Sequence, residues 1–195
     1  MEKTIKKEKQ EKTTEKKSFN GAALGSIGFA IATLLLNLQN VHAYDLSSMI
    51  LAVGLAVGAF VQIVAGIFEA VKGHNFTGIA FIAYGFYWLS QFIILLVEAG
   101  GNTLESAANG CFLLMWAILT LFMFIASFKH SIMTRISFGT LMLTFLILSI
   151  HAFTNVDAIQ IVGGSIGIVC GLSAFYSAIG QIINGEFNKK IFPLL

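Results

Sequence analysis

The sequence predicts an all-α membrane protein, a six-transmembrane-helix bundle with both termini in the cytosol. Its 195 residues are 56% hydrophobic and only 11% charged, whereas soluble domains carry about 25% charged residues. When the apolar stretches are threaded as six spans, all twelve Lys and Arg side chains fall on one side of the membrane. The opposite connections carry only acidic charges, and this asymmetry is typical of cations retained in the cytosol during insertion.

Each span is predicted from an apolar stretch close to the roughly 20 residues that a helix needs to cross hydrocarbon. The spans are expected at residues 21–41, 47–71, 76–97, 108–128, 132–151 and 159–183. Because the connections are short, residues 20–195 form one membrane domain without room for a soluble catalytic domain. Residues 1–19 mix Lys and Glu with few apolar side chains, which predicts a disordered cytosolic tail. Contact of this tail with anionic lipid is the alternative.

Every span carries one face of small or polar residues at helical spacing. In chain order these faces hold Gly21, Gly25, Phe29, Thr33, Asn37 and Asn40; Gly54, Gly58, Gln62, Gly66 and Glu69; Thr77, Phe81, Tyr84, Trp88 and Gln91; Asn109, Trp116, Thr120 and Ser127; Thr140, Thr144 and His151; Ser173, Ser177, Gln181 and Asn184. Polar groups facing lipid are costly, so these faces are expected to point into the bundle.

Two interpretations of these faces remain open. For single Gly, Ser and Thr residues, close helix packing is favoured, because Gly54 and Gly58 form a small-xxx-small pattern. For the amides together, a solvated path through the bundle is favoured. Glu69 is the one acid within a span, and it either pairs with Lys72 three residues later or handles substrate or protons.

No constellation for catalysis, metal binding or a cofactor occurs in the sequence. It contains no HExxH, CxxC, phosphate-binding loop or nucleophile elbow. Cys111 and Cys170 are isolated in apolar stretches and predict packing thiols. The net charge of +2 is explained by membrane orientation, so no nucleic-acid partner is inferred. An enzyme is not expected.

Several motifs resemble the acetate uptake transporter family, which includes the succinate-acetate permeases. The resemblance covers about residues 20 to 193 and is specific as a set. The motifs are NGAALGSIGF at 20–29, LLLNLQNV at 34–41, QIVAGIFE at 62–69, AYGFYW at 83–88, TLFMF at 120–124 and CGLSAFY at 170–176.

The resemblance implies a six-helix subunit that assembles into a hexamer, each subunit with its own path for acetate and related short carboxylates. It also implies a constriction formed by Phe29, Tyr84 and Leu141. The rest of the expected pathway comprises Asn20, Gly25, Thr33, Asn37, Asn40, Gln62, Glu69, Trp88, Gln91, Thr144, Ala174 and Ser177.

The first span departs from the family pattern Asn-Pro-x-Pro-Leu-Gly. Here Asn20, Leu24 and Gly25 are retained, whereas Gly21 and Ala23 replace the prolines. Proline fixes φ and removes a donor, so the entrance of this chain is expected to be more mobile or more helical.

The predicted function is a plasma-membrane transporter or channel for acetate and related short-chain carboxylates, with succinate as a further substrate, passive or proton-linked. The constriction would gate by size and dewetting, while amides and hydroxyls replace hydration water. A pathway for another small solute such as ammonia and a non-transporting membrane sensor are the alternatives.

Overall fold

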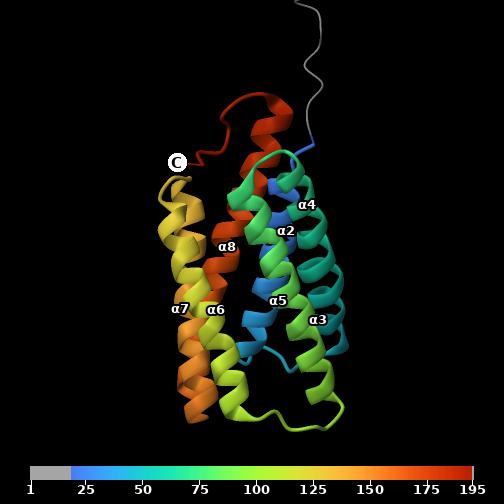
Figure 1. Ribbon diagram of the computed structural model, residues 1–195, viewed down its shortest axis with the longest axis vertical. Coiled ribbons are helices and arrows are strands. Elements are labelled where there is room, and N and C mark those ends of the chain that lie inside the picture. Colours follow the sequence, from blue (N-terminus) through green and yellow to red (C-terminus); the bar gives the residue numbers. More distant parts are fainter. Residues whose placement is uncertain (1–18, 195) are drawn as a thin grey trace, which may run out of the picture.

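The structure, a computed structural model, describes residues 19–194. Within this range it contains six helical stretches long and apolar enough to cross a membrane (Figure 1), which confirms the predicted all-α fold with six spans. The helices are α2 (Gly21–Asn40), a second span made of α3 (Ser48–Val53), η1 (Gly54–Val61) and α4 (Gln62–Val71), then α5 (Asn75–Ala99), α6 (Ser106–Ser127), α7 (Ile132–Thr154) and α8 (Asp157–Phe187). The predicted tail lies outside the described residues, apart from Phe19.

The sixth span extends further than the sequence predicted. Helix α8 continues to Phe187 and ends at Asn188, whose φ of 50° is left-handed. Asn155 ends α7 in the same way, with a φ of 53°. Asparagine tolerates this conformation better than most residues, so it terminates a helix where no glycine is present.

The second span is interrupted by a π-helical segment, η1, that the sequence analysis did not predict. Such wide turns are rare and often occur at functional sites. Gly58 within the segment lies so close to Trp88 that a Cβ at this position would stand 2.7 Å from the indole. The side chain of Gln62, just after the segment, donates from Nε2 to the carbonyl of Gly58 at 2.7 Å. The π turn thus ends at an amide that faces the interior.

Helix α2 lies at the centre, packed against α8 on one side and against η1 and α4 on the other. Helix α7 packs against α6 and α8, and α5 packs against α4 and η1. Aromatic rings join α5 to α6, since the ring centroids of Tyr87 and Trp116 are 5.1 Å apart and those of Tyr84 and Trp116 are 5.8 Å apart. These rings therefore bridge α5 and α6, whose backbones are widely spaced.

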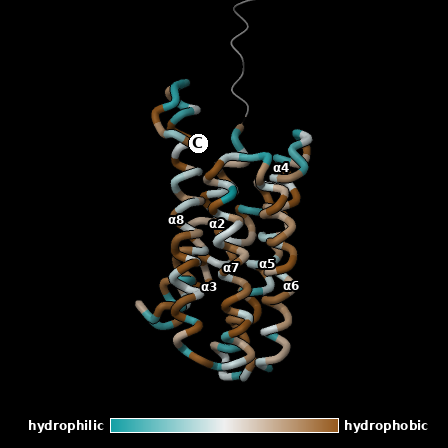
Figure 2. The backbone as a smooth tube through the Cα atoms, turned by 90° about the vertical axis from the view of Figure 1, so that its left-hand side faces the viewer, coloured by the Kyte–Doolittle hydropathy of each residue, from teal (hydrophilic) through white to brown (hydrophobic). Residues whose placement is uncertain are grey.

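The outer surface of the bundle is largely apolar, and its interior holds polar side chains beside a hydrophobic core. Its largest fully buried side chains include Gln62, Thr120, Ser127 and Ser149. Large hydrophobic side chains such as Met115, Phe122 and Val71 are more than half exposed. Figure 2 shows hydrophobic residues along the middle of the helices and hydrophilic ones at both ends, as a bilayer environment requires.

Candidate transport pathway

A cavity of about 330 Å³ opens within the half of the bundle that holds Phe19 and the C-terminal segment, the top in Figure 1. We call it the upper cavity. Its wall combines hydroxyl and amide groups with aromatic rings from α2, α4, α5, α7 and α8. The described lining residues are Ala22, Ser26, Phe29, Gln62, Phe76, Thr77, Ala80, Phe81, Tyr84, His130, Ser131, Thr134, Ser137, Phe138, Leu141, Ala174, Ser177, Gln181 and Leu194. No Lys, Arg, Asp or Glu is among them.

Phe29, Tyr84 and Leu141, which we call the neck, lie together on this wall although they come from three different helices. All three are at most 9% exposed. The ring centroids of Phe29 and Tyr84 are 6.3 Å apart. The Tyr84 hydroxyl lies 2.9 Å from Thr120 Oγ1, and Thr120 in turn donates to the Trp116 carbonyl at 2.6 Å. This chain of hydrogen bonds fixes the tyrosine ring in place.

A second cavity, the lower cavity, has a volume of about 870 Å³ and lies at the opposite end of the bundle. It includes the predicted pathway residues Asn40 and Gln91, together with Glu98 and His151. It shares no lining residue with the upper cavity. On α7 the upper cavity ends at Leu141 and the lower one begins at Leu148, a rise of about 10 Å along a helix. The path is closed between them.

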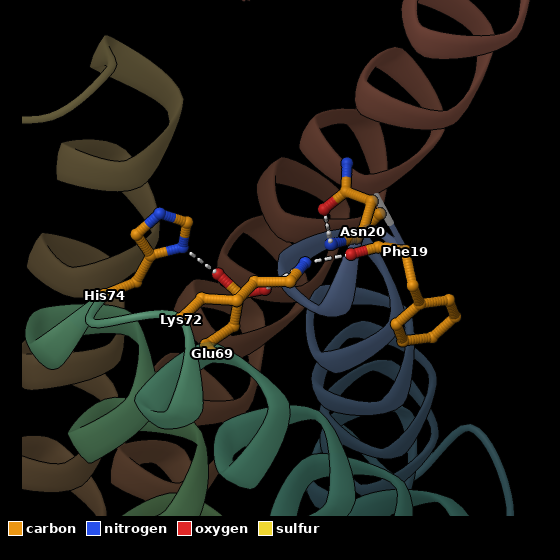
Figure 3. Close-up of polar contacts among 6 residues, drawn as sticks. Phe19, Asn20, Glu69, Lys72 and His74 are labelled. Atoms are coloured by element: carbon orange, nitrogen blue, oxygen red, sulfur yellow. Dashed lines mark hydrogen bonds and ion pairs between the residues drawn. The ribbon is translucent and has the colours of Figure 1, made fainter. Parts of the chain in front are cut away.

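The mouth of the upper cavity carries a charged cluster centred on Glu69, shown in Figure 3. Glu69 is buried, with only 3% of its surface exposed. Its Oε2 lies 2.7 Å from His74 Nδ1, and its Oε1 lies 3.7 Å from Lys72 Nζ. Lys72 also donates to the Phe19 carbonyl. The predicted pairing with Lys72 is present, but His74 is the nearer partner. Gly73, with a φ of 81°, turns the chain so that His74 reaches the carboxylate.

The entrance of the first span is helical from Gly21 onward. The Asn20 side chain caps α2 by accepting from Ala23 N at 3.0 Å, as is usual for asparagine at this position. A Cβ on residue 21 would stand 2.7 Å from Glu69 Oε1. Glycine in place of the family's proline therefore leaves room for the buried carboxylate beside the helix start.

Five of the predicted pathway residues line none of these cavities, namely Gly25, Thr33, Asn37, Trp88 and Thr144. Gly25 faces the ring of Phe81, and Trp88 covers Gly58. The amide of Asn37 lies against Gly167 and donates to Thr33 O at 2.8 Å. Thr144 donates to the carbonyl of Thr140 at 2.9 Å. In contrast, Gln62, Ala174 and Ser177 line the upper cavity, and Asn20 and Glu69 line its mouth.

The C-terminal segment after α8, which no sequence pattern predicted, folds back toward the upper cavity. The Asn184 side chain donates to Phe192 O at 2.7 Å and accepts from the backbone of Ile191 and Phe192. The Tyr176 hydroxyl donates to Pro193 O at 3.0 Å. Leu194 thereby reaches the cavity wall. No periodicity could have indicated this contact, because it depends on the turn after α8.

Comparison with known proteins agrees with this geometry. The family model described as the GPR1/FUN34/yaaH family matches residues 2–193. The chain belongs to the GPR1/FUN34/yaaH family. The resemblance inferred from the motifs is confirmed.

Two curated proteins and one solved structure illustrate the similarity. The succinate-acetate/proton symporter SatP of Escherichia coli K12 is 38% identical over 177 residues, covering 90% of this chain and 94% of that protein. Acetate permease A of Emericella nidulans is 29% identical over 204 residues, covering 94% and 68%. The structure of the bacterial acetate channel SatP superimposes with a TM-score of 0.86 at 37% identity, covering 91% of this chain and 99% of that one.

Proposed function

We propose that this member of the GPR1/FUN34/yaaH family is a membrane transporter or channel for acetate and related short-chain carboxylates, including succinate. The observation that carries the proposal is the pair of cavities that enter the bundle from opposite ends, the upper of which is lined by the neck residues Phe29, Tyr84 and Leu141. The similarity to a succinate-acetate/proton symporter and an acetate permease supports the same substrate class.

The lining of the two cavities suits a small carboxylate. A carboxyl group with a pKa near 4.3 is mostly ionised at neutral pH, so the path has to replace its hydration shell. Ser177 and Gln181 offer hydroxyl and amide groups in the upper cavity, and Gln91 and Asn109 offer amides in the lower one. Neither cavity has a Lys or Arg among its described lining residues, so no fixed cation would trap the anion.

The proposal extends to location and assembly. We place the protein in the plasma membrane with both termini in the cytosol, because all its Lys and Arg residues then face the cytosol. We also propose a homo-oligomer, a hexamer as the family resemblance implies. The exposed apolar side chains on the outer faces of α5 and α6, such as Phe86, Ile93 and Phe122, would contact lipid or neighbouring subunits.

Uptake of labelled acetate into proteoliposomes tests the function. We expect uptake above that of protein-free vesicles, inhibited by excess propionate and unaffected by excess glucose. Uptake equal to that of protein-free vesicles by fully assembled protein would refute the proposal. Labelled methylammonium in the same vesicles tests the ammonia alternative, for which we expect no protein-dependent flux.

A further inference from the structure

We propose that the carboxylate of Glu98, in the wall of the lower cavity, discriminates against doubly charged substrates, so that monocarboxylates pass more readily than dicarboxylates. This inference rests on the proposed carboxylate transport and assigns a specificity-determining residue outside the neck. Phe29, Tyr84 and Leu141 carry no charge at neutral pH, so a selection by charge requires another group along the path.

Glu98 lies where a substrate enters or leaves the lower cavity. It is in the last turn of α5, which ends at Ala99, and its side chain is exposed. Tyr87 and Gln91 of the same helix also line this cavity. These residues recur at spacings of four and seven, which places them on one face of the helix. Gln91 lies about 10 Å deeper than Glu98. A carboxylate that reaches the amide of Gln91 through this cavity therefore passes close to Glu98.

The negative charge of Glu98 has no counter-charge in the cavity wall. Among the described lining residues of the lower cavity, Glu98 is the one acid, and no Lys or Arg accompanies it. No described cation forms an ion pair with it, since the printed pairs both involve Glu69 at the other end of the bundle. The remaining ionisable groups of the wall are Tyr87 and His151, and the His151 Nδ1 lies 3.1 Å from the Val156 carbonyl oxygen.

The basic residues of the chain are too far away to cancel this charge. Helix α5 begins at Asn75 beside the mouth of the upper cavity and ends at the bottom of the bundle in Figure 1. Its rise between Asn75 and Glu98 is about 34 Å, whereas the Debye length at 0.1 M salt is about 10 Å. The described cations lie at the upper end, near the α4–α5 turn, the α6–α7 turn and the end of α8. They are Lys72, Lys129, Arg135, Lys189 and Lys190.

Local stability does not explain an acid at this position. A negative charge in the last turn of a helix opposes the helix dipole. The other acids at the lower end lie at or before helix starts, where the dipole favours them: Asp45 precedes α3, Glu105 is the N-cap of α6 and Asp157 begins α8. None of these three lines the lower cavity. Glu98 alone combines an unfavourable helix position with a place in the cavity wall.

The size of the effect follows from the charges involved. Succinate carries two negative charges well above the carboxyl pKa of about 4.3, whereas acetate carries one. At 7–10 Å in water, one extra charge on the substrate changes its local concentration beside Glu98 about twofold to threefold. The dicarboxylate therefore encounters a higher barrier at Glu98 than the monocarboxylate does, in either direction of flux.

Uptake of labelled acetate, succinate and succinamate by the same proteoliposomes tests the inference. Succinamate has the length of succinate, but a neutral amide replaces one carboxylate, so it separates charge from size. The measurements are made at pH 8, where histidine side chains are mostly neutral, and at low ionic strength. In Glu98→Gln the flux of succinate relative to both acetate and succinamate should rise about twofold to threefold. In about 1 M salt, where the Debye length is about 3 Å, this rise should disappear.

Two control variants accompany the test. Glu105→Gln removes an acid from the same end of the bundle that lines none of the cavities, and Glu98→Asp keeps the charge, so both should retain the flux ratios of the unmodified protein. Gel filtration and thermal unfolding should show Glu98→Gln to be assembled and no less stable.

Three outcomes decide the matter. Unchanged ratios in Glu98→Gln with intact acetate uptake would overturn the inference and leave the carboxylate pathway standing. An equal rise for succinate and succinamate would also overturn it, because the effect would then depend on size. Failure of acetate uptake by the unmodified protein would instead refute the proposed function.

Discussion

Truncation of Leu141 is the sharpest test of the neck. Leu141 is 5% exposed and lines the upper cavity, as Phe29 and Tyr84 do. Leu141→Ala removes Cγ and both Cδ atoms, which widens the upper cavity at its α7 wall. Acetate already fits a narrow path better than succinate does. A barrier lowered by about 1.4 kcal/mol for the larger acid alone would raise the ratio of succinate to acetate flux about tenfold.

The same substitution also affects stability, and the structure bounds this effect. Buried Leu→Ala changes cost about 2–5 kcal/mol, and the cost grows with the volume of the cavity left behind. One side of Leu141 already faces a cavity of about 330 Å³ and lacks partner atoms there. We therefore expect a loss near the lower limit, about 2 kcal/mol, which leaves the protein folded and assembled.

The assay is uptake of labelled succinate and acetate by the same proteoliposomes, so that the amount of active protein cancels in the ratio. Leu143→Ala is the matched control, because Leu143 lies on the same helix and is 40% exposed on its outer surface. Its flux ratio should equal that of the unmodified protein. If Leu141→Ala leaves the ratio unchanged, or if Leu143→Ala raises it equally, Leu141 does not form the narrow point.

Three further predictions concern topology, assembly and the C-terminal segment. The topology is tested in a protein whose Cys111 and Cys170 are replaced by Ala. A single cysteine at position 45 should react with an impermeant thiol reagent added outside intact cells, and one at position 129 should react only after lysis. The opposite labelling would mean that the protein lies in the membrane with the opposite orientation. Native mass spectrometry in mild detergent should show a hexamer, whereas a fully active monomer would remove any need for the ring. Asn184→Ala removes the hydrogen bonds that hold the C-terminal segment near Phe192. Leu194 should then leave the wall of the upper cavity, and acetate flux should rise severalfold. Unchanged flux would show that Leu194 does not obstruct the path.

The sequence by itself determined the number of spans and most of their ends. These features depend on local quantities, namely the length of apolar runs relative to the thickness of hydrocarbon and the side on which cations lie. The first span, predicted at 21–41, is observed at Gly21–Asn40, and the fourth, predicted at 108–128, at Ser106–Ser127. The motifs likewise indicated the family, because they are read directly from the chain.

The tertiary structure alone decided which inward-facing residues line the cavities. Helical periodicity places Asn37 and Gln62 alike on interior faces, but Asn37 fills the space left by Gly167 on α8 whereas Gln62 borders the upper cavity. The difference arises from how closely the neighbouring helices approach. That spacing depends on the side chains of two helices at once, as does the hydrogen bond between Tyr84 and Thr120. A single helical repeat contains no such information, so the lining of the two cavities emerges only when the helices are packed.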